Sequence, residues 1–203
     1  DLRVDGVMPD ISPDGKRVLY ITRDGDDWYA AVMAIDGDGP KNVVSVDPDK
    51  ADYVFPRWVD NESFVYRTRS GIAGDDSELF IATLDGQRER VTDNVVKDVF
   101  PQPIDRDRVV YLSHLVDQKL SDGTNLSPAA VWMSEKRDGR LHDRSLGFDA
   151  YSFRLVGDDI LYLVPNGTTC ELFRAPLDNP KQAVNLTEQI RAKFEDLPAV
   201  VKR

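Results

Sequence analysis

The sequence predicts an all-β fold, a run of β-propeller blades that each contain four antiparallel strands. Three observations lead to this class. A tyrosine in an apolar setting recurs every 45 to 51 residues, a matched segment precedes each tyrosine, and another follows it and ends in a turn signal. A repeat of about 40 to 50 residues with four short strands per unit is typical of propellers.

The recurring tyrosine marks the predicted second strand of each unit. It stands at Tyr20, Tyr66, Tyr111 and Tyr162, between Val, Leu, Ile or Phe neighbours that favour strands. The predicted first strands lie about a dozen residues earlier, at 7–11, 54–58, 99–103 and 151–155. The first three copies carry a proline at the third position, and the fourth lacks it.

The predicted third strands, at 32–35, 79–84, 131–134 and 172–177, lead to Asp-Gly or Asp-Asn pairs. Such pairs between β-rich runs are strong hairpin signals. A shorter fourth strand follows, clearest at 41–46 and 182–186, and the segment 188–194 resembles a helix. We therefore expect one domain over 1–203, with blades at approximately 6–46, 53–93, 98–146 and 150–187.

Other repeat folds fit less well. Helical solenoids need a period near 3.6, whereas apolar residues here alternate or form short β-branched runs. An immunoglobulin-like sandwich does not repeat one motif four times. An unrelated all-β domain with chance internal similarity remains the alternative.

The segment 196–201 repeats the opening of the other units, with Pro198 where Pro9, Pro56 and Pro101 stand. We therefore expect the start of a fifth blade at 196–203. A closed propeller pairs its last blade with its first. The expectation is a larger propeller, or an oligomer that completes the ring; completion of a compact assembly in another way is the alternative.

Loop lengths predict where a partner binds. The connections between first and second strands, and between third and fourth strands, are short in every unit. All length variation falls in the other two kinds of connection, which emerge together at the opposite edge, and recognition loops on repeat proteins collect in this way. The predicted binding residues on this long-loop rim are Asp47, Asp49, Asp75, Asp76, Asp117, Lys119 and Asp122.

The ligand predicted for this rim is a basic peptide, a protein or a cation. The competing interpretation is that aspartates are simply frequent in turns and solvated loops. The segment 115–128 is the more specific signal, because a long loop without periodicity tends to be functional or disordered.

Composition limits the partners. The formal net charge is −10 and the acidic residues are spread along the chain, so nucleic acid is not an expected partner. No apolar run predicts a membrane span, and nothing at the N-terminus predicts a signal peptide. Cys170, the single cysteine, excludes an internal disulfide, and its strand-like neighbours predict a small buried side chain.

The segment 11–20, with Ser12, Pro13, Asp14, Gly15 and Lys16 at its turn, resembles the repeat signature of TolB-like propellers. The resemblance extends over most of the chain, although only the first unit keeps the signature intact. It implies a bacterial extracytoplasmic protein that uses the propeller as a protein-binding platform. The segment 54–62 is weakly similar to the N-terminal propeller of the prolyl oligopeptidase family, which gates a separate hydrolase domain.

Motifs for chemistry are missing from the sequence. There is no Gly-x-Ser-x-Gly nucleophile elbow and no phosphate loop. His114 and His142 are the only histidines and do not form a metal-ligand pattern, so we expect packing roles, no metal and no cofactor. The Asp-Gly pairs near 24–27 and 36–39 do not continue into a calcium loop.

These observations predict a non-catalytic module that binds a protein or peptide through the long-loop rim, outside the cytoplasm. Two alternatives stay open. One is the accessory propeller of a prolyl oligopeptidase-family peptidase whose catalytic domain lies elsewhere. The other is a propeller hydrolase or lactonase with a metal in its central channel.

Overall fold

The computed structural model describes residues 6–36, 39, 41–46, 54–69, 77–94, 96–114 and 129–195. The chain divides into two compact units, and each is described by itself. The described part of the first comprises 6–114, within those ranges, and 132–144; that of the second comprises 129–131 and 145–195.

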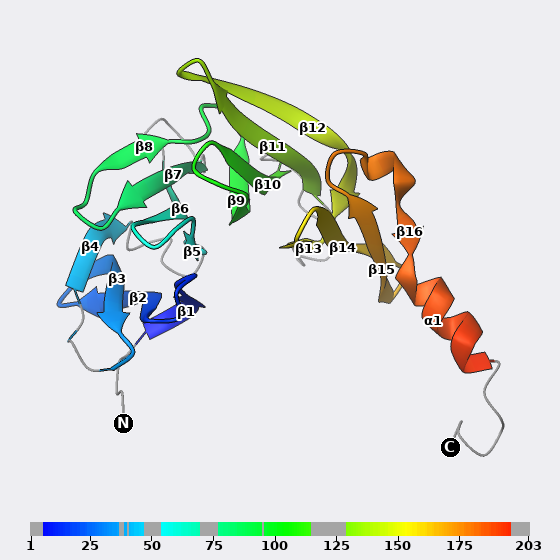
Figure 1. Ribbon diagram of the computed structural model, residues 1–203, viewed down its shortest axis with the longest axis horizontal. Helices are drawn as coiled ribbons and strands as arrows, with labels where there is room; N and C mark the ends of the chain where they lie inside the picture. The colour runs from blue at the N-terminus through cyan, green and yellow to red at the C-terminus, as the bar shows by residue number, and fades with distance from the viewer. Residues whose placement is uncertain are drawn as a thin grey trace. The chain divides into compact units, whose positions relative to one another are not determined.

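The structure is all-β, as predicted, and its strands follow the sequence repeats (Figure 1). The first repeat contains β1 (Gly6–Ile11), β2 (Arg17–Asp24), β3 (Asp27–Ala34) and β4 (Lys41–Val46). The second contains β5 (Arg57–Trp58), β6 (Ser63–Arg69), β7 (Ser77–Thr83) and β8 (Arg88–Arg90). The third contains β9 (Lys97–Pro103), β10 (Arg108–His114), β11 (Ala129–Arg137) and β12 (Arg140–Ala150).

The second unit holds the fourth repeat. It contains β13 (Ser152–Val156), β14 (Asp159–Asn166), β15 (Thr169–Pro176) and β16 (Val184–Asn185), with the short 3₁₀ helix η2 (Pro180–Gln182) before β16. The predicted helical segment forms α1 (Leu186–Glu195), which packs on β15. The Leu172 N–H donates to Thr187 Oγ1 across this contact at 2.8 Å.

Each repeat is an antiparallel meander. The first sheet runs β1-β2-β3-β4 and the last runs β13-β14-β15-β16. The second and third repeats share one sheet because Ser77 and Lys97 form a single parallel pair between β7 and β9. Four-stranded meanders of this kind are the building unit of a propeller, which confirms the predicted fold class. The number of blades stays a prediction, since 196–203 lie outside the described residues.

One backbone hydrogen bond recurs in all four repeats and fixes the short-turn end of each sheet. A residue at or just beyond the C-terminal end of the third strand donates its N–H to a carbonyl in the turn between the first and second strands. The four bonds, 2.7 to 3.1 Å long, are Ile35 to Lys16, Leu84 to Glu62, Lys136 to Asp107 and Leu177 to Asp158. The equivalence shows that the two short connections of every repeat lie at the same end.

The first strands share an unusual backbone conformation. Met8, Phe55 and Phe100 each precede the repeated proline and have φ of 56°, 47° and 53°. This left-handed region is costly for bulky residues. The conformation interrupts the pairing of the strand, and it coincides with a register shift between Val7 and Asp10 in β1. In the second repeat only Arg57 and Trp58 form strand pairs with β6, so β5 is shorter than the predicted 54–58, although the Val54 carbonyl still accepts from the Arg67 N–H at 2.9 Å.

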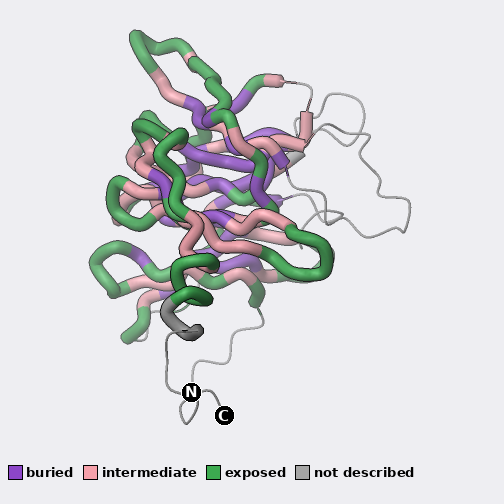
Figure 2. The backbone as a smooth tube through the Cα atoms, turned by 90° about the vertical axis from the view of Figure 1, so that its right-hand side faces the viewer, coloured by how far each residue is buried: buried purple, intermediate pink, exposed green. Residues whose placement is uncertain are grey.

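Apolar cores form between successive repeats in the first unit. Alternate residues of one strand face opposite neighbours: Phe64 and Tyr66 pack with Leu19 and Ile21 of the first repeat, whereas Val65 packs with Val109 and Tyr111 of the third. Figure 2 shows this as buried strands whose ends and turns are exposed. All four predicted tyrosines are buried, at 5% exposure or less.

Two details of the third and fourth repeats bear on the predictions. Asp138 and Gly139, with φ of 50° and 74°, form the predicted hairpin turn between β11 and β12. Cys170, predicted to be buried, is exposed, because it lies next to the Gly167 turn at the solvated end of β15. No helix among the described residues is long and apolar enough to cross a membrane.

Candidate functional site

The seven residues predicted to bind a partner, Asp47, Asp49, Asp75, Asp76, Asp117, Lys119 and Asp122, lie outside the described residues. The described strands nevertheless show where their segments attach. Segment 70–76 joins the end of β6 to Ser77 at the start of β7, and segment 115–128 follows His114 at the end of β10. The base of the long-loop rim is therefore described, and it is the candidate site.

A cluster of buried and half-buried polar side chains occupies this base in the first unit. We call it the buried acid cluster; its members are Ser77, Glu78, Thr92, Asn94, Asp98 and Ser113. Glu78, Thr92 and Asp98 are each 0% exposed, and Ser77 is 2% exposed. The polar groups come from four segments: β7, the connection from β8 to β9, β9 and β10.

Asn94 links the two carboxyl groups of the cluster. Its backbone N–H donates to Glu78 Oε1 at 2.9 Å, and its side-chain Nδ2 donates to Asp98 Oδ2 at 2.8 Å. Its own Oδ1 accepts from the Val96 N–H at 2.9 Å. Thr92 extends the network, since its hydroxyl donates to Glu78 Oε2 and accepts from the Leu79 N–H. Burial of these groups is tolerated because they are hydrogen-bonded to one another.

Within the cluster, Asp98 is the carboxyl group whose pKa is strongly raised. Ser113 Oγ donates to its Oδ1 at 2.7 Å, and its backbone carbonyl accepts from Ser77 Oγ at 3.3 Å. Burial is the largest cause that raises the pKa of Asp98, and the nearby Glu78 carboxylate adds to it. The Ser113, Asn94 and Thr92 hydrogen bonds act in the opposite direction, and the resulting pKa is about 7. The ion pairs recorded among the described residues include neither carboxyl group.

Other ionisable groups surround the cluster. On β10, burial raises the pKa of the Tyr111 phenol, and Asp98, Asp143 of β12 and Glu78 add to the effect. His114, half-buried at the end of the same strand, has its pKa lowered by burial and then by Lys97 and Arg67. His114 and Lys97 are directly paired across β10 and β9. The rim base therefore combines buried acids with flanking basic groups.

This chemistry favours proton binding and polar recognition. Among the described residues no three His, Cys, Asp or Glu side chains are grouped as metal ligands. The carboxyl, hydroxyl and amide groups of the cluster already hydrogen-bond one another. The chemical change open to them is the gain or loss of a proton by Asp98 near neutral pH.

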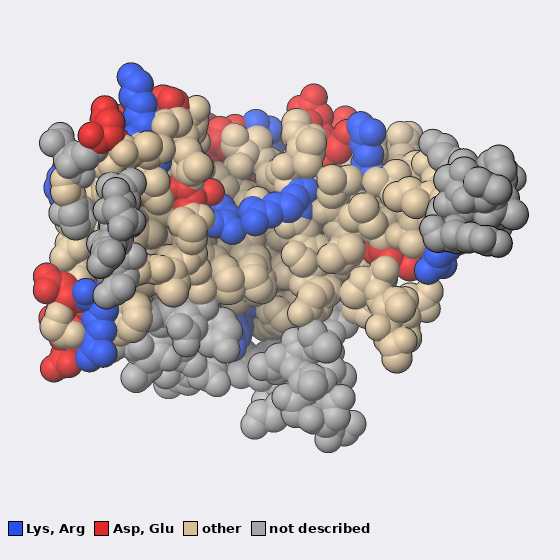
Figure 3. All heavy atoms as spheres, turned by 90° about the horizontal axis from the view of Figure 1, so that it is seen from below, with Lys and Arg blue, Asp and Glu red and all other residues tan. Residues whose placement is uncertain are grey.

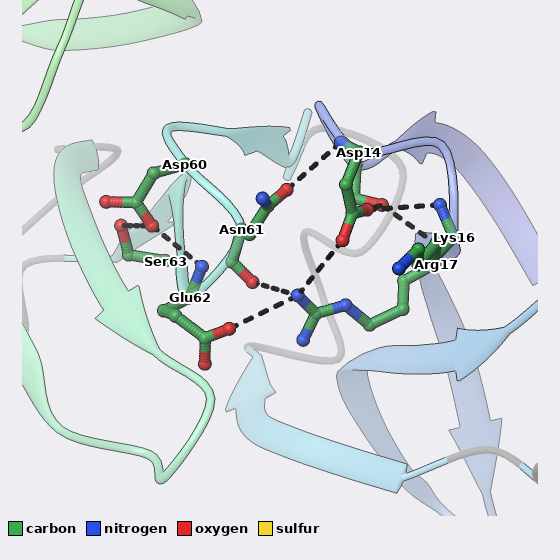
Figure 4. Close-up of polar contacts among 8 residues, drawn as sticks. Asp14, Lys16, Arg17, Asp60, Asn61, Glu62 and Ser63 are labelled. Atoms are coloured by element: carbon green, nitrogen blue, oxygen red, sulfur yellow. Dashed lines mark hydrogen bonds and ion pairs between the residues drawn. The ribbon is translucent and has the colours of Figure 1, made fainter.

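The opposite end of the first two repeats, the short-turn face, is held by the signature turn (Figure 4). Within the turn, Ser12 Oγ and the Lys16 N–H both donate to Asp14 Oδ1, at 2.6 and 3.1 Å. The Ser12 hydrogen bond and then the Lys16 N–H lower the pKa of Asp14. The signature thus builds a rigid turn rather than a reactive group.

The same turn reaches the second repeat. The Asp14 N–H donates to Asn61 Oδ1 at 3.1 Å, and Arg17 donates to the Asn61 carbonyl and to Glu62 Oε1, the latter at 3.3 Å. Arg17 also lies 5.5 Å over the Trp58 ring. Within the second repeat, Asp60 accepts from the Glu62 N–H, and it also pairs with Arg106 of the third repeat at 3.4 Å. The turn residues therefore join neighbouring repeats.

A shallow groove lies between the second and third repeats near this face. Ile81, Val91, Val109 and Leu141 contribute its apolar lining, and Glu89 and Lys136 form an ion pair beside it. On the surface seen from below, acidic and basic side chains lie close together in several places (Figure 3). Neither feature forms a charged patch of one sign, so the buried acid cluster remains the more specific arrangement.

Sequence reasoning did not find the buried acid cluster. A signal was present: Glu78 is the charged residue of a strand whose centre, 79–82, is apolar, and Asp98 directly precedes the repeated Val-Phe-Pro segment. A charged residue within a predicted core strand indicates a buried polar role. His114, predicted to pack in a strand or loop, ends β10 and is half-buried.

The fold and the repeated turn geometry define a β-propeller module. No family model matches the sequence, and no curated protein matches it. Solved structures do. A protein assigned as TolB from Agrobacterium tumefaciens has a TM-score of 0.56 at 23% identity, over 74% of this chain and 51% of that chain. TolB from Acinetobacter baumannii has a TM-score of 0.62 at 16% identity, over 87% and 42%.

The β-propeller domain of the trilobed protease from Pyrococcus furiosus is also similar, with a TM-score of 0.58 at 14% identity, over 92% of this chain and 59% of that domain. This chain spans about half the length of these structures. Both predicted resemblances, to TolB and to peptidase propellers, are thus confirmed at the level of the fold.

Proposed function

We propose that the chain is a non-catalytic β-propeller module that binds a protein or peptide on its long-loop rim. The observation that supports this most is the contrast between the two ends of the sheets. At the short-turn end, the same backbone hydrogen bond recurs in all four repeats. At the rim, the connection between second and third strands is a two-residue turn in the first and fourth repeats, but it lengthens to 70–76 in the second and 115–128 in the third. Such variation is typical of a recognition surface on a rigid scaffold.

The proposed partner carries a basic segment. The predicted binding residues include six aspartates and one lysine. Acidic loops attract basic partners and accelerate their association, more strongly at low ionic strength. We place the module outside the cytoplasm, as the TolB-like resemblance implies; fractionation of cells that produce the full-length protein tests this location.

Deletion of 119–127 tests the binding role. The rim variant is expected to fold like the parent, because the strands on either side are paired within the described structure. Both forms are immobilised and exposed to envelope extract from the source cells, and each captured protein is then purified and measured by calorimetry. The expected result is at least a tenfold weaker affinity for the deletion variant.

Lys16→Ala is the matched control. Lys16 is exposed at the short-turn face, and its hydrogen bond to Asp14 comes from the backbone N–H, which the substitution keeps. This variant should bind like the parent. Equal affinity of the deletion variant and the parent for every captured protein contradicts the proposal. Weakening by Lys16→Ala but not by the deletion assigns the binding surface to the short-turn face instead.

A further inference from the structure

We infer that the buried acid cluster is a proton-operated switch, which holds the base of the long-loop rim together when Asp98 is protonated and loosens it when Asp98 ionises. The switch would regulate partner binding at the rim, and only this biological consequence rests on the proposed function. The switch itself concerns the hydrogen-bonded network of the second and third repeats.

The position of the two carboxyl groups supports the switch. Glu78 belongs to β7 and Asp98 to β9, both are 0% exposed, and Asn94 donates one hydrogen bond to each. When both are ionised, two negative charges share one buried region. Like charges at low dielectric repel strongly, and one proton between them relieves that repulsion.

The cluster is connected to the strand ends at the rim. Ser77, bonded to the Asp98 carbonyl, directly follows segment 70–76, and His114, next to Ser113, directly precedes segment 115–128. β7 and β9 meet at the rim through the single parallel pair Ser77 and Lys97. Separation of the two acids therefore acts on the strand ends from which both segments extend.

Charged and titratable groups from several strands surround Asp98. β7 presents Glu78 and β10 presents Tyr111, which is itself influenced by Asp143 of β12. Lys97 of β9 and Arg67 of β6 act on His114. Asp93, in the connection that holds Thr92 and Asn94, is exposed and pairs with Arg90. Among these groups, Glu78 is the one recorded as acting on the charge of Asp98.

The expected pH dependence follows from the sign of the shift. The pKa of Asp98 is raised from 3.8 to about 7, so the closed network holds a proton that the opened network releases. The stability that protonated Asp98 contributes to the closed network is complete below pH 3.8, declines as pH rises and is lost once pH passes 7. Opening should become about tenfold easier per pH unit in this window and level off above it.

Hydrogen exchange of single amides, measured by NMR from pH 5 to pH 8, tests the switch without any partner. The reporters are the N–H groups of Leu79, Asn94 and Val96, which bond members of the cluster. The Ile35 and Leu84 N–H groups of the short-turn face are internal controls. After correction for intrinsic exchange, reporter protection should fall at least tenfold more than control protection between pH 5 and pH 7.

Asp98→Asn should abolish this pH dependence, because an amide retains acceptor and donor capacity toward Asn94 and Ser113 but does not ionise. Glu78→Gln should move the midpoint to lower pH, because it removes the neighbouring charge. His114→Gln should leave the midpoint unchanged; the lowered pKa of His114 gives a dependence of opposite sign, with stability rising as pH increases to 6.5.

Reporter amides that follow the controls at every pH overturn the inference, as does an Asp98→Asn variant that keeps the slope. If Asp98→Asn fails to fold, the carboxyl ¹³C shift of Asp98 in the parent decides: titration near neutral pH supports the switch, and titration near 4 contradicts it. Because no partner is used, these outcomes are independent of the capture experiment, whose failure concerns the binding role alone.

Discussion

The two ends of the sheets in the first unit are held by different chemistry. At the short-turn face, Arg17, Asp60 and Arg106 join neighbouring repeats through ion pairs that are partly or largely solvated. At the rim, the second and third repeats meet around two fully buried carboxyl groups. Solvated pairs are weak and sensitive to salt, whereas buried acids respond strongly to pH. The comparison indicates that contacts at the short-turn face respond weakly, and to salt, whereas contacts at the rim respond strongly to pH.

The largest effect should come from the apolar interior between the two ends. Phe64 is 0% exposed and contacts the Trp58 and Tyr66 rings. Phe64→Ala should lower the free energy of unfolding by about 3–5 kcal/mol, measured by urea denaturation. A loss below about 1 kcal/mol would mean that the packing of the first and second repeats does not carry the stability of this unit.

The next largest effect should be the pH dependence at the rim. The raised pKa of Asp98 corresponds to at most about 4 kcal/mol of stability that is present at acid pH and lost by about pH 7. Asp98→Asn should therefore have a flatter stability profile than the parent between pH 5 and pH 7, measured by chemical denaturation at each pH. Parallel profiles for the two proteins would remove Asp98 as the titrating group.

A smaller effect is expected at the short-turn face. Arg17→Ala removes two hydrogen bonds and a cation–π contact from a side chain that is 24% exposed, at a cost of about 1 kcal/mol. The loss should shrink in 0.5 M salt, because the Glu62 partner is 74% exposed. A loss that is independent of salt would assign the effect to the Trp58 contact instead.

The smallest effect should come from Arg106→Ala. Arg106 and Asp60 are 57% and 42% exposed, so their pair at 3.4 Å is screened by water. We expect a change of about 0.5 kcal/mol or less in the free energy of unfolding. A change as large as that of Arg17→Ala would show that the ion pairs of this face act as one network.

Much of the fold was predictable because the strands and turns of a propeller repeat depend on residues that are near one another in the sequence. The tyrosine positions located four second strands, and Asp138 with Gly139 located a hairpin turn, since each depends on neighbours in sequence. The short β5 was not predicted, because the left-handed Phe55 that interrupts it is visible only in the backbone. The buried prediction for Cys170 was wrong for a related reason: a strand pattern does not say how far along the strand the core extends.

The site was less predictable than the fold. Loop lengths identified the rim, but its predicted residues lie outside the described structure and their binding role stays a prediction. The buried acid cluster was not predicted, because Glu78, Asn94 and Asp98 are ordinary polar residues when each is seen in its own segment. Only their shared hydrogen bonds distinguish them from solvated residues.

The sequence by itself determined the repeat, the class of fold and the end at which the connections vary, because strand alternation and turn preference depend on residues a few positions apart. The tertiary structure decided which polar groups meet. The single parallel pair of Ser77 with Lys97 brings β7 beside β9. That register, set by packing between repeats rather than within them, buries Glu78 and Asp98 in one hydrogen-bonded network and changes the protonation of Asp98.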